Sequence, residues 1–291
     1  MRAQSRVAPI ERVLVTGANG YLAPHVINAL LDRGITVVAA ARSAGAGAEH
    51  PLLTRIVADV LADDFAIDSI PGGAPDALLH LAWQDGFIHN APTHLVALPK
   101  HLRLLESAVR AEVGRISVIG SMHEIGYWEG AIDATTPNRP LSLYGIAKNA
   151  LRQAGEAVIA PSAQWQWLRC YYIVGDDRRN RSVFAKLLEA VGRGAETFPF
   201  TSGTAEYDFI DIDVLAHQIA VAVIAPDAEG TIECCSGVGV ALGDRVQRFI
   251  DENELNIRLD LGAFPDRPYD SPGLWGDASR IRAILAEDAA R

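Results

Sequence analysis

Short apolar runs alternate with longer amphipathic stretches from the N-terminal region of the chain up to Gly175. The runs have the length of buried strands, whereas the stretches repeat apolar residues every three or four positions, as helices do. Strands are predicted at 12–16, 36–41, 53–57, 77–82, 116–119 and 167–174, and helices at 22–33, 92–112 and 144–159. This alternation predicts an α/β fold, a doubly wound parallel sheet with helices on both faces.

The pattern becomes less regular after Gly175. Further strands are predicted at 197–200, 209–212, 231–234 and 257–261, and further helices at 183–193, 214–224, 242–252 and 278–286. Residues 262–276 are rich in proline, glycine and aromatic residues, so a structured loop is predicted there. We expect residues 11–174 to form one large domain to which residues 205–236 return. Residues 175–204 and 237–291 are expected to form a small second lobe.

The composition excludes several classes of partner. The chain has 291 residues, a formal net charge of −10 and a pI of about 5.3, and it has no long basic run, so neither nucleic acid nor a membrane surface is an expected partner. An odd count of three cysteines does not suggest a disulfide framework. Residues 1–9 lack the apolar core of a signal peptide, and no apolar run reaches the roughly 18 residues of a membrane helix. We therefore expect a cytoplasmic protein.

A glycine-containing segment, Thr16–Ala23, joins the first predicted strand to the first predicted helix. Glycines at such a junction let the backbone approach a pyrophosphate, and the helix N-terminus directs its N–H groups toward it. The candidate contacts are Gly17, Asn19, Gly20, Tyr21 and Leu22. The segment predicts a Rossmann-like dinucleotide-binding domain over residues 11–174 and leaves the small lobe to bind substrate. A plain strand–turn–helix connection is the alternative.

The end of the second strand bears on which dinucleotide is preferred. An NAD site usually places an acidic residue there for the ribose hydroxyls, whereas this chain has Ala41 followed by Arg42. A guanidinium suits a 2′-phosphate, so NADP(H) is predicted to be preferred, with NAD(H) possible. Asp59 and Val60, after the third strand, are candidates to border the adenine. Arg42 as a solvated loop charge and Asp59 as a turn residue remain alternatives.

Tyr144 and Lys148 lie one helical turn apart, and Ser121 follows the fifth predicted strand. Residues spaced in this way share one face of a helix, and a nearby ammonium favours the phenolate, lowering the tyrosine pKa from about 10. Tyr144 is then a candidate proton donor and acceptor, Lys148 its electrostatic partner, and Ser121 a second hydrogen-bond donor to the same substrate oxygen. Together with the glycine segment, this set predicts hydride transfer at a carbon–oxygen centre.

The sequence resembles the extended short-chain dehydrogenases/reductases, the group of sugar-nucleotide epimerases, dehydratases and reductases. The resemblance covers nearly the whole chain. It is carried by Thr16–Ala23, His80–Ala82, Ser121, Tyr144 with Lys148, Tyr172–Gly175, Phe209–Asp213 and Arg267–Asp270. Two positions depart from the family pattern: Ala23 replaces the third glycine, and Ala97 stands where an asparagine is common. The resemblance implies that Leu81, Ala82, Tyr171 and Val174 also contact the cofactor.

The residues that follow Ser121 bear on the reaction. Dehydratases of the family carry Asp-Glu directly after this position, whereas this chain has Met122 and His123, which counts against dehydration. Because Arg42 favours an exchangeable NADPH, net reduction of a ketone is the preferred hypothesis for the reaction. The alternatives are an epimerase that retains NAD and a non-catalytic NADP-sensing protein.

Candidate substrate contacts follow from the family resemblance and from position. The Arg267–Asp270 segment resembles an Arg-Pro-x-Asp segment in which the arginine holds a nucleotide diphosphate, and Arg181 follows Gly175 at the expected cleft. The candidates are Trp83, Met122, His123, Tyr172, Arg181, Phe200, Arg267 and Asp270. Asp208, Asp211 and Asp213 lie close together in the sequence, but no metal is expected there. Asp213 is expected to cap the helix that follows.

Three segments, 120–124, 198–203 and 264–277, look most like bacterial dTDP-6-deoxy-L-talose 4-dehydrogenases and related dTDP-4-keto-6-deoxyhexose reductases. This resemblance implies a nucleotide-sugar substrate and NADPH-dependent reduction of its 4-keto group in deoxysugar biosynthesis. The family also implies a homodimer formed through the helices at 92–112 and 144–159.

Overall fold

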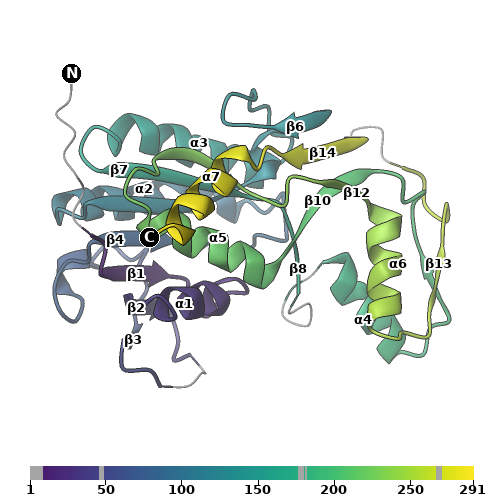
Figure 1. The fold of residues 1–291 in the computed structure, drawn as a ribbon, viewed down its shortest axis with the longest axis horizontal. Coiled ribbons are helices and arrows are strands. Elements are labelled where there is room, and N and C mark those ends of the chain that lie inside the picture. Colours follow the sequence, from purple (N-terminus) through teal and green to yellow (C-terminus); the bar gives the residue numbers. More distant parts are fainter. Residues whose placement is uncertain (1–8, 46–48, 176–179, 181, 267–270) are drawn as a thin grey trace.

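The computed structural model describes residues 9–45, 49–175, 180, 182–266 and 271–291. A seven-stranded parallel sheet forms its largest layer, with strand order β11-β7-β5-β4-β1-β2-β3 (Figure 1). The strands are β1 (Arg12–Thr16), β2 (Thr36–Ala41), β3 (Leu53–Val57), β4 (Ala77–His80), β5 (Arg115–Ser121), β7 (Gln164–Cys170) and β11 (Gly230–Cys234). After β1, the strands β2 and β3 are added on one side and β4, β5, β7 and β11 on the other. The carboxyl ends of β1 and β4 therefore border a crevice at this switch point. The predicted doubly wound, Rossmann-like α/β fold is confirmed.

Helices cover both faces of this sheet. The helices are α1 (Ala23–Leu31), α2 (Thr93–Arg110), α3 (Leu143–Val158), α5 (Ile212–Ile224) and α7 (Ser279–Ala289). Alternate strand residues face opposite sides, so Val13 and Val15 pack with α1, α5 and α7, while Leu14 packs with α2 and α3. Among the described residues, no helix is both long and apolar enough to cross a membrane.

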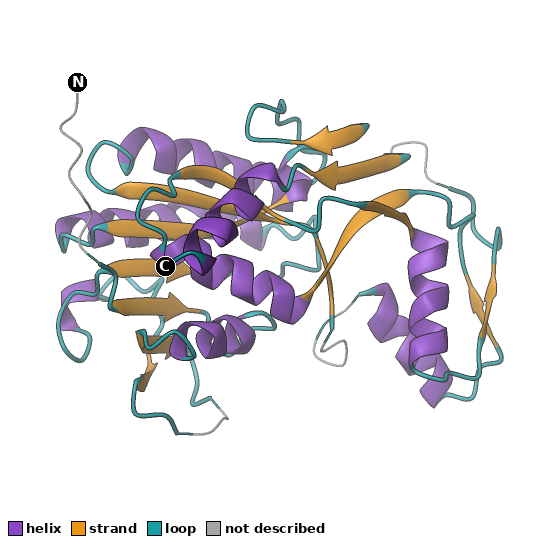
Figure 2. Cartoon of the chain, viewed as in Figure 1, coloured by secondary structure: helices purple, strands orange, loops and turns teal. Residues whose placement is uncertain are grey.

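A second sheet stands beside the first, as the orange strands of Figure 2 show. Its strands lie in the order β12-β10-β14-β6, and β8 pairs with β10. They are β6 (Gly130–Ile132), β8 (Tyr172–Val174), β10 (Glu206–Asp211), β12 (Gly239–Ala241) and β14 (Gly273–Gly276). The single strand predicted at 167–174 is therefore two strands in different sheets, separated by Tyr171. The loop predicted at 262–276 contains β14.

The remaining elements form a small lobe at the end of the molecule away from the large sheet (Figure 1). They are α4 (Val183–Gly192), β9 (Thr197–Pro199), α6 (Leu242–Glu252) and β13 (Arg258–Asp260). Phe184, Leu187, Val246 and Phe249 belong to a core cluster separate from those of the large sheet. Short 3₁₀ helices lie at η1 (Ile67–Ser69) and η2 (Met122–Glu124). The predicted residue ranges of the two domains stay a prediction.

The start of α5 differs from expectation. Asp211, not Asp213, caps this helix, because its Oδ1 accepts hydrogen bonds from the backbone nitrogens of Asp213 (2.8 Å) and Val214 (3.3 Å). Asp213 lies inside the first turn, where its Oδ1 is 2.6 Å from Nδ1 of His25 on α1. The two helices on this face are thereby joined at their N-terminal ends.

Candidate active site

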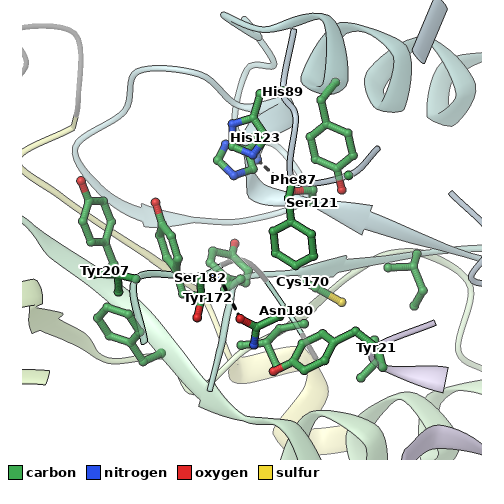
Figure 3. A pocket seen from close by; sticks show the side chains of 18 of the residues that line it. Tyr21, Phe87, His89, Ser121, His123, Cys170, Tyr172, Asn180, Ser182 and Tyr207 are labelled. Atoms are coloured by element: carbon green, nitrogen blue, oxygen red, sulfur yellow. Dashed lines mark hydrogen bonds between the residues drawn. The ribbon is translucent and has the colours of Figure 1, made fainter. Parts of the chain in front are cut away.

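A cavity of about 1100 Å³ opens where the carboxyl ends of the parallel strands meet the second sheet and the small lobe. Gly17 and Tyr21 line one end, Ser121 and Tyr144 line the wall beyond β5, and Tyr207 lines the side formed by the second sheet. Figure 3 shows that side chains from all three parts of the molecule point into this space. Its size and position fit a site for two ligands held side by side.

The glycine segment forms one end of the cavity. Gly17 has φ of 71°, and a Cβ there would lie 2.7 Å from the Cα of Ala82, so only glycine fits this turn against the segment that follows β4. The first turn of α1 contains no acidic side chain, and its N-cap residue, Leu22, makes no side-chain capping bond. The backbone N–H groups there are thus available to a pyrophosphate, which fits the predicted dinucleotide.

Four of the predicted cofactor contacts, Asn19, Arg42, Asp59 and Val60, lie on the surface or in the core. Asn19 donates through Nδ2 to the carbonyl oxygen of Ser43 (2.9 Å), which ties the glycine loop to the end of β2. Arg42 is exposed directly after β2. Asp59 accepts a hydrogen bond from the backbone nitrogen of Leu61 (3.1 Å), the turn role left open as an alternative. Val60 is buried in the core beneath α2.

Ser121, Tyr144 and Lys148 come together at one wall of the cavity. Ser121 ends β5, and Tyr144 and Lys148 lie on successive turns of α3. Ser121 and Tyr144 both line the cavity, and the Ser121 side chain acts to lower the pKa of Tyr144. Lys148 Nζ donates to the carbonyl oxygen of Ile119 (2.7 Å) and lies 3.9 Å from the ring centroid of Trp83, a cation–π contact. A phenol, a second hydroxyl group and an ammonium group therefore lie at one wall of the cavity.

The pKa of Tyr144 differs from the sequence-based expectation. Burial raises it above its usual value, and the hydrogen bond with Ser121 opposes this rise. Lys148 does not overcome the burial, because its ammonium lies 5.9 Å from the Tyr144 ring centroid and closer to Trp83. Burial lowers the pKa of Lys148 itself to about 8, against the opposing effects of Glu124 and Cys170. The protein alone thus keeps Tyr144 protonated, the form that gives a proton to a carbonyl oxygen.

Aromatic side chains surround Tyr144. Its ring stacks on His89 (centroids 5.7 Å apart) and meets His94 and His123 at 5.3 and 5.9 Å. Burial lowers the pKa of His123 to about 3, so this side chain is neutral at pH 7. Figure 3 shows His89 and His123 next to each other beside Ser121. The centroids of the two imidazole rings are 4.3 Å apart. His123 was predicted here, whereas His89 and His94 were not.

The loop between β4 and α2 explains these additional contacts. The carbonyl oxygen of His89 accepts from the backbone nitrogen of Tyr144 (2.8 Å), and Asn90 Oδ1 accepts from Leu143 (3.1 Å), so the loop satisfies the first amides of α3. Phe87 lines the cavity from the same loop and is 52% exposed. The only sequence signal was a dense group of histidines and aromatics after residue 80.

The other predicted contacts divide into three groups. Trp83, Leu81, Tyr171 and Tyr172 line the cavity, although Tyr171 also donates its hydroxyl to Glu233 Oε2 (2.8 Å). Met122, Val174 and Phe200 are buried in core clusters instead, because their strands and turn point them away from the cavity. Arg181, Arg267 and Asp270 lie outside the described residues. The predicted diphosphate contacts therefore stay predictions.

Comparison with known proteins gives the same family. Residues 13–234 match the model of the NAD dependent epimerase/dehydratase family. The dTDP-6-deoxy-L-talose 4-dehydrogenase (NAD(+)) of Aggregatibacter actinomycetemcomitans is 42% identical over 91% of this chain and 98% of that protein. The UDP-glucose 4-epimerase of Azospirillum brasilense is 26% identical over 98% of this chain and 88% of that protein.

Solved structures agree with this assignment at the level of the fold. The UDP-N-acetylglucosamine 4-epimerase of Methanobrevibacter ruminantium, in complex with UDP-N-acetylmuramic acid, superposes with a TM-score of 0.79 at 20% identity, over 95% of this chain and 92% of that one. The range 13–234 that matches the family model includes the glycine segment as well as Ser121, Tyr144 and Lys148. The chain belongs to the NAD dependent epimerase/dehydratase family, the extended short-chain dehydrogenases/reductases, whose members compared above act at position 4 of nucleotide sugars.

Proposed function

We propose that this protein reduces the 4-keto group of a nucleotide-activated 4-keto-6-deoxyhexose, with dTDP as the nucleotide and NADPH as the reductant. The observation that carries the proposal is the meeting of Ser121, Tyr144 and Lys148 at the wall of a cavity whose other end is the glycine segment. The 42% identity to a dTDP-6-deoxy-L-talose 4-dehydrogenase supports the choice of sugar and of carbon 4.

The chain's own residues hold the substrate oxygen and supply its proton. Ser121 and Tyr144 donate hydrogen bonds to the carbonyl oxygen, which polarises the carbonyl group. Tyr144, kept protonated by its burial, gives its proton to this oxygen, and Lys148 stabilises the resulting phenolate. When bound, the dinucleotide supplies the hydride that reaches carbon 4. The aromatic groups around Tyr144 exclude water from the site of proton transfer.

The choice between NADPH and NADH rests on opposing observations. Arg42 follows β2 with no acidic residue at the end of that strand, which favours a 2′-phosphate. The relative with 42% identity is named for NAD(+). We propose NADPH because the charge at this position acts directly on the group that distinguishes the two cofactors.

An epimerase that retains NAD is the second candidate, favoured by the 4-epimerases among the relatives. Such an enzyme oxidises and reduces the same carbon, so it consumes no free cofactor. A non-catalytic NADP-sensing protein is the third, and it requires neither Tyr144 nor Lys148. Net oxidation of added NADPH separates the first function from both alternatives.

The test is NADPH oxidation with dTDP-4-keto-6-deoxyglucose and with its 3,5-epimer, each generated in situ, followed at the nicotinamide absorbance, with NADH in parallel. Turnover that requires a keto sugar supports the proposal, and product NMR then gives the stereochemistry at carbon 4. Binding of both cofactors without turnover of either sugar contradicts it. Bound NAD in the purified protein together with interconversion of hydroxyl epimers supports the epimerase.

A homodimer through α2 and α3 is proposed as well. Leu95 and Val96 on α2 and Ile146 on α3 are exposed, with Val96 71% accessible. Burial of such side chains between two copies is favourable. Light scattering of the wild type and of Val96→Asp tests this: a dimer that the substitution dissociates supports the interface, and a wild-type monomer contradicts it.

A further inference from the structure

Glu124 lies directly behind the reaction centre and is fully buried. It ends η2, the short turn that follows Ser121. Glu124 Oε1 accepts a hydrogen bond from the backbone nitrogen of Ser121 (2.6 Å). The Ser121 hydroxyl oxygen accepts one from the backbone nitrogen of His123 (3.3 Å). Figure 3 labels both Ser121 and His123. These reciprocal bonds are a capping box at the end of β5 rather than at a long helix.

The capping box determines which way the Ser121 hydroxyl points. Because the oxygen accepts the N–H of His123, its hydrogen points away from that amide and can be donated within the cavity, which Ser121 and Tyr144 both line. The backbone bond to Glu124 fixes the position from which the side chain departs. Loss of that bond frees the turn that orients the hydroxyl.

Glu124 is itself held by a set of donors. Trp167 Nε1 lies 2.8 Å from Oε2 and 3.0 Å from Oε1, and the Arg169 guanidinium approaches Oε2 at 3.5 Å. Arg169 is held in turn by Glu233, whose Oε1 lies 2.6 Å from Arg169 Nη1. These neighbours of the Glu124 carboxyl group are all hydrogen-bond donors, which matches an acceptor-only carboxylate.

Gly120 makes this arrangement possible. A Cβ on residue 120 would lie 2.1 Å from Trp167 Nε1, so a side chain there would displace the indole from Glu124. The register places Gly120 beside Arg169 and Ser121 beside Cys170, so β5 and β7 together position both the reacting serine and its support. Residues from β5 and β7 thus converge on one carboxylate.

The geometry points to Glu124 as a positioning residue of the reaction, which fixes the direction of the Ser121 hydroxyl toward Tyr144 and the substrate oxygen. This inference rests on the proposed keto reduction, since it concerns the same serine. Glu124 does not reach the cavity, because it lies behind Ser121 and is absent from the lining side chains of that space. Its effect is therefore expected in the rate of reaction and not in cofactor binding.

The test compares E124A with E124Q. Glutamine can keep the capping bond to Ser121, whereas alanine cannot. We expect E124A to lower kcat by about 10- to 100-fold, with KM for the sugar and Kd for NADPH changed less than about 3-fold, and E124Q to restore kcat to at least about five times that of E124A. Normal kcat in folded E124A, or equal losses in both variants, would overturn the inference.

A second pair of variants tests the same positioning role in case E124A does not fold. W167F removes the indole donor to Glu124, and W165F makes the same change at a buried tryptophan of β7 for which no bond to Glu124 is found among the described residues. We expect a several-fold lower kcat in W167F alone at similar thermal stability. Equal kcat in the two variants contradicts a positioning role.

Amide hydrogen exchange separates this inference from the proposed function. Faster exchange of the Ser121 and His123 amides in E124A, but not in E124Q, is expected whether or not the assayed sugar is the substrate. Failure of the wild type to reduce either keto sugar refutes the proposed function alone. Unchanged exchange in E124A refutes the positioning role alone.

Discussion

The two ends of the cavity are built in different ways. At the proposed cofactor end, Gly17 and the first turn of α1 offer backbone groups, and the charged candidate Arg42 stands exposed on the surface. At the proposed reaction end, Ser121 and Lys148 are buried and supported by further buried polar groups such as Glu124. A backbone site tolerates change in side chains around it, whereas a site of interlocked side chains does not. Substitutions at the two ends should therefore separate cofactor affinity from rate.

The largest effect is expected at Tyr144. Y144F removes the proton donor and should lower kcat by about 10²- to 10⁴-fold while the Kd for NADPH stays the same. Steady-state kinetics and fluorescence titration measure the two quantities. Y127F is the control, because the Tyr127 hydroxyl is exposed and bonds to Glu129. An unchanged kcat in Y144F would remove the distinction between the two ends.

A large pH effect is expected from Lys148, whose pKa burial lowers to about 8. The ammonium is present below this pH and lost above it, so kcat/KM for reduction should fall about tenfold per unit as pH rises beyond 8. A pH profile of kcat/KM checks this in the free enzyme. In K148R the guanidinium stays protonated, so the residual activity should lack this decline. The same decline in K148R would assign it to another group.

At the other end of the cavity, G17A should weaken cofactor binding. The residue adopts φ of 71°, which costs an alanine about 1–2 kcal/mol, and the new Cβ would meet the Ala82 backbone. We expect NADPH affinity to fall more than about tenfold. G34A is the matched control, because Gly34 has φ of 75° and a methyl group added there would meet no atom within 4 Å. Equal NADPH affinity in the two variants would show that the close approach to β4 is unimportant.

The smallest effect is expected at Arg42. R42A should lower the preference for NADPH over NADH by about tenfold, because one exposed charge-assisted contact is lost. The ratio of kcat/KM for the two cofactors measures it, and kcat itself should not change. R110A, an exposed arginine in the last turn of α2, serves as the control. A wild type that already prefers NADH would refute the role assigned to Arg42.

The elements that carry clear apolar periodicity were predictable, and the short strands of the second sheet were not. Strands β6 and β14 have three and four residues and contain glycine, so no apolar run marks them. The change of sheet at Tyr171 was hidden within one continuous run, since only the partner strand distinguishes β7 from β8. Such strands are defined by distant pairing rather than by local sequence.

The proximity of the site residues was predictable where it follows from their spacing along the chain. Tyr144 and Lys148 share a helix face, and Ser121 follows a strand, so their meeting at one cavity could be predicted, while their catalytic roles stay a prediction. The support by Glu124, Trp167 and Arg169 depends on the alignment of β5 with β7, which the sequence does not express. The pKa of Tyr144 likewise depends on burial, which a four-residue spacing cannot convey.

The place of β14 in the second sheet has a consequence for how the protein is made. This strand, Gly273–Gly276, pairs with both β10 and β6, whose own residues precede it by more than sixty positions. During synthesis the large sheet has six of its seven strands by Cys170, but β6 must wait for almost the whole chain before its partner leaves the ribosome. A nascent chain thus carries an unpaired β6 beside a nearly complete large sheet. Late pairing leaves this strand edge exposed to aggregation until the chain is almost finished.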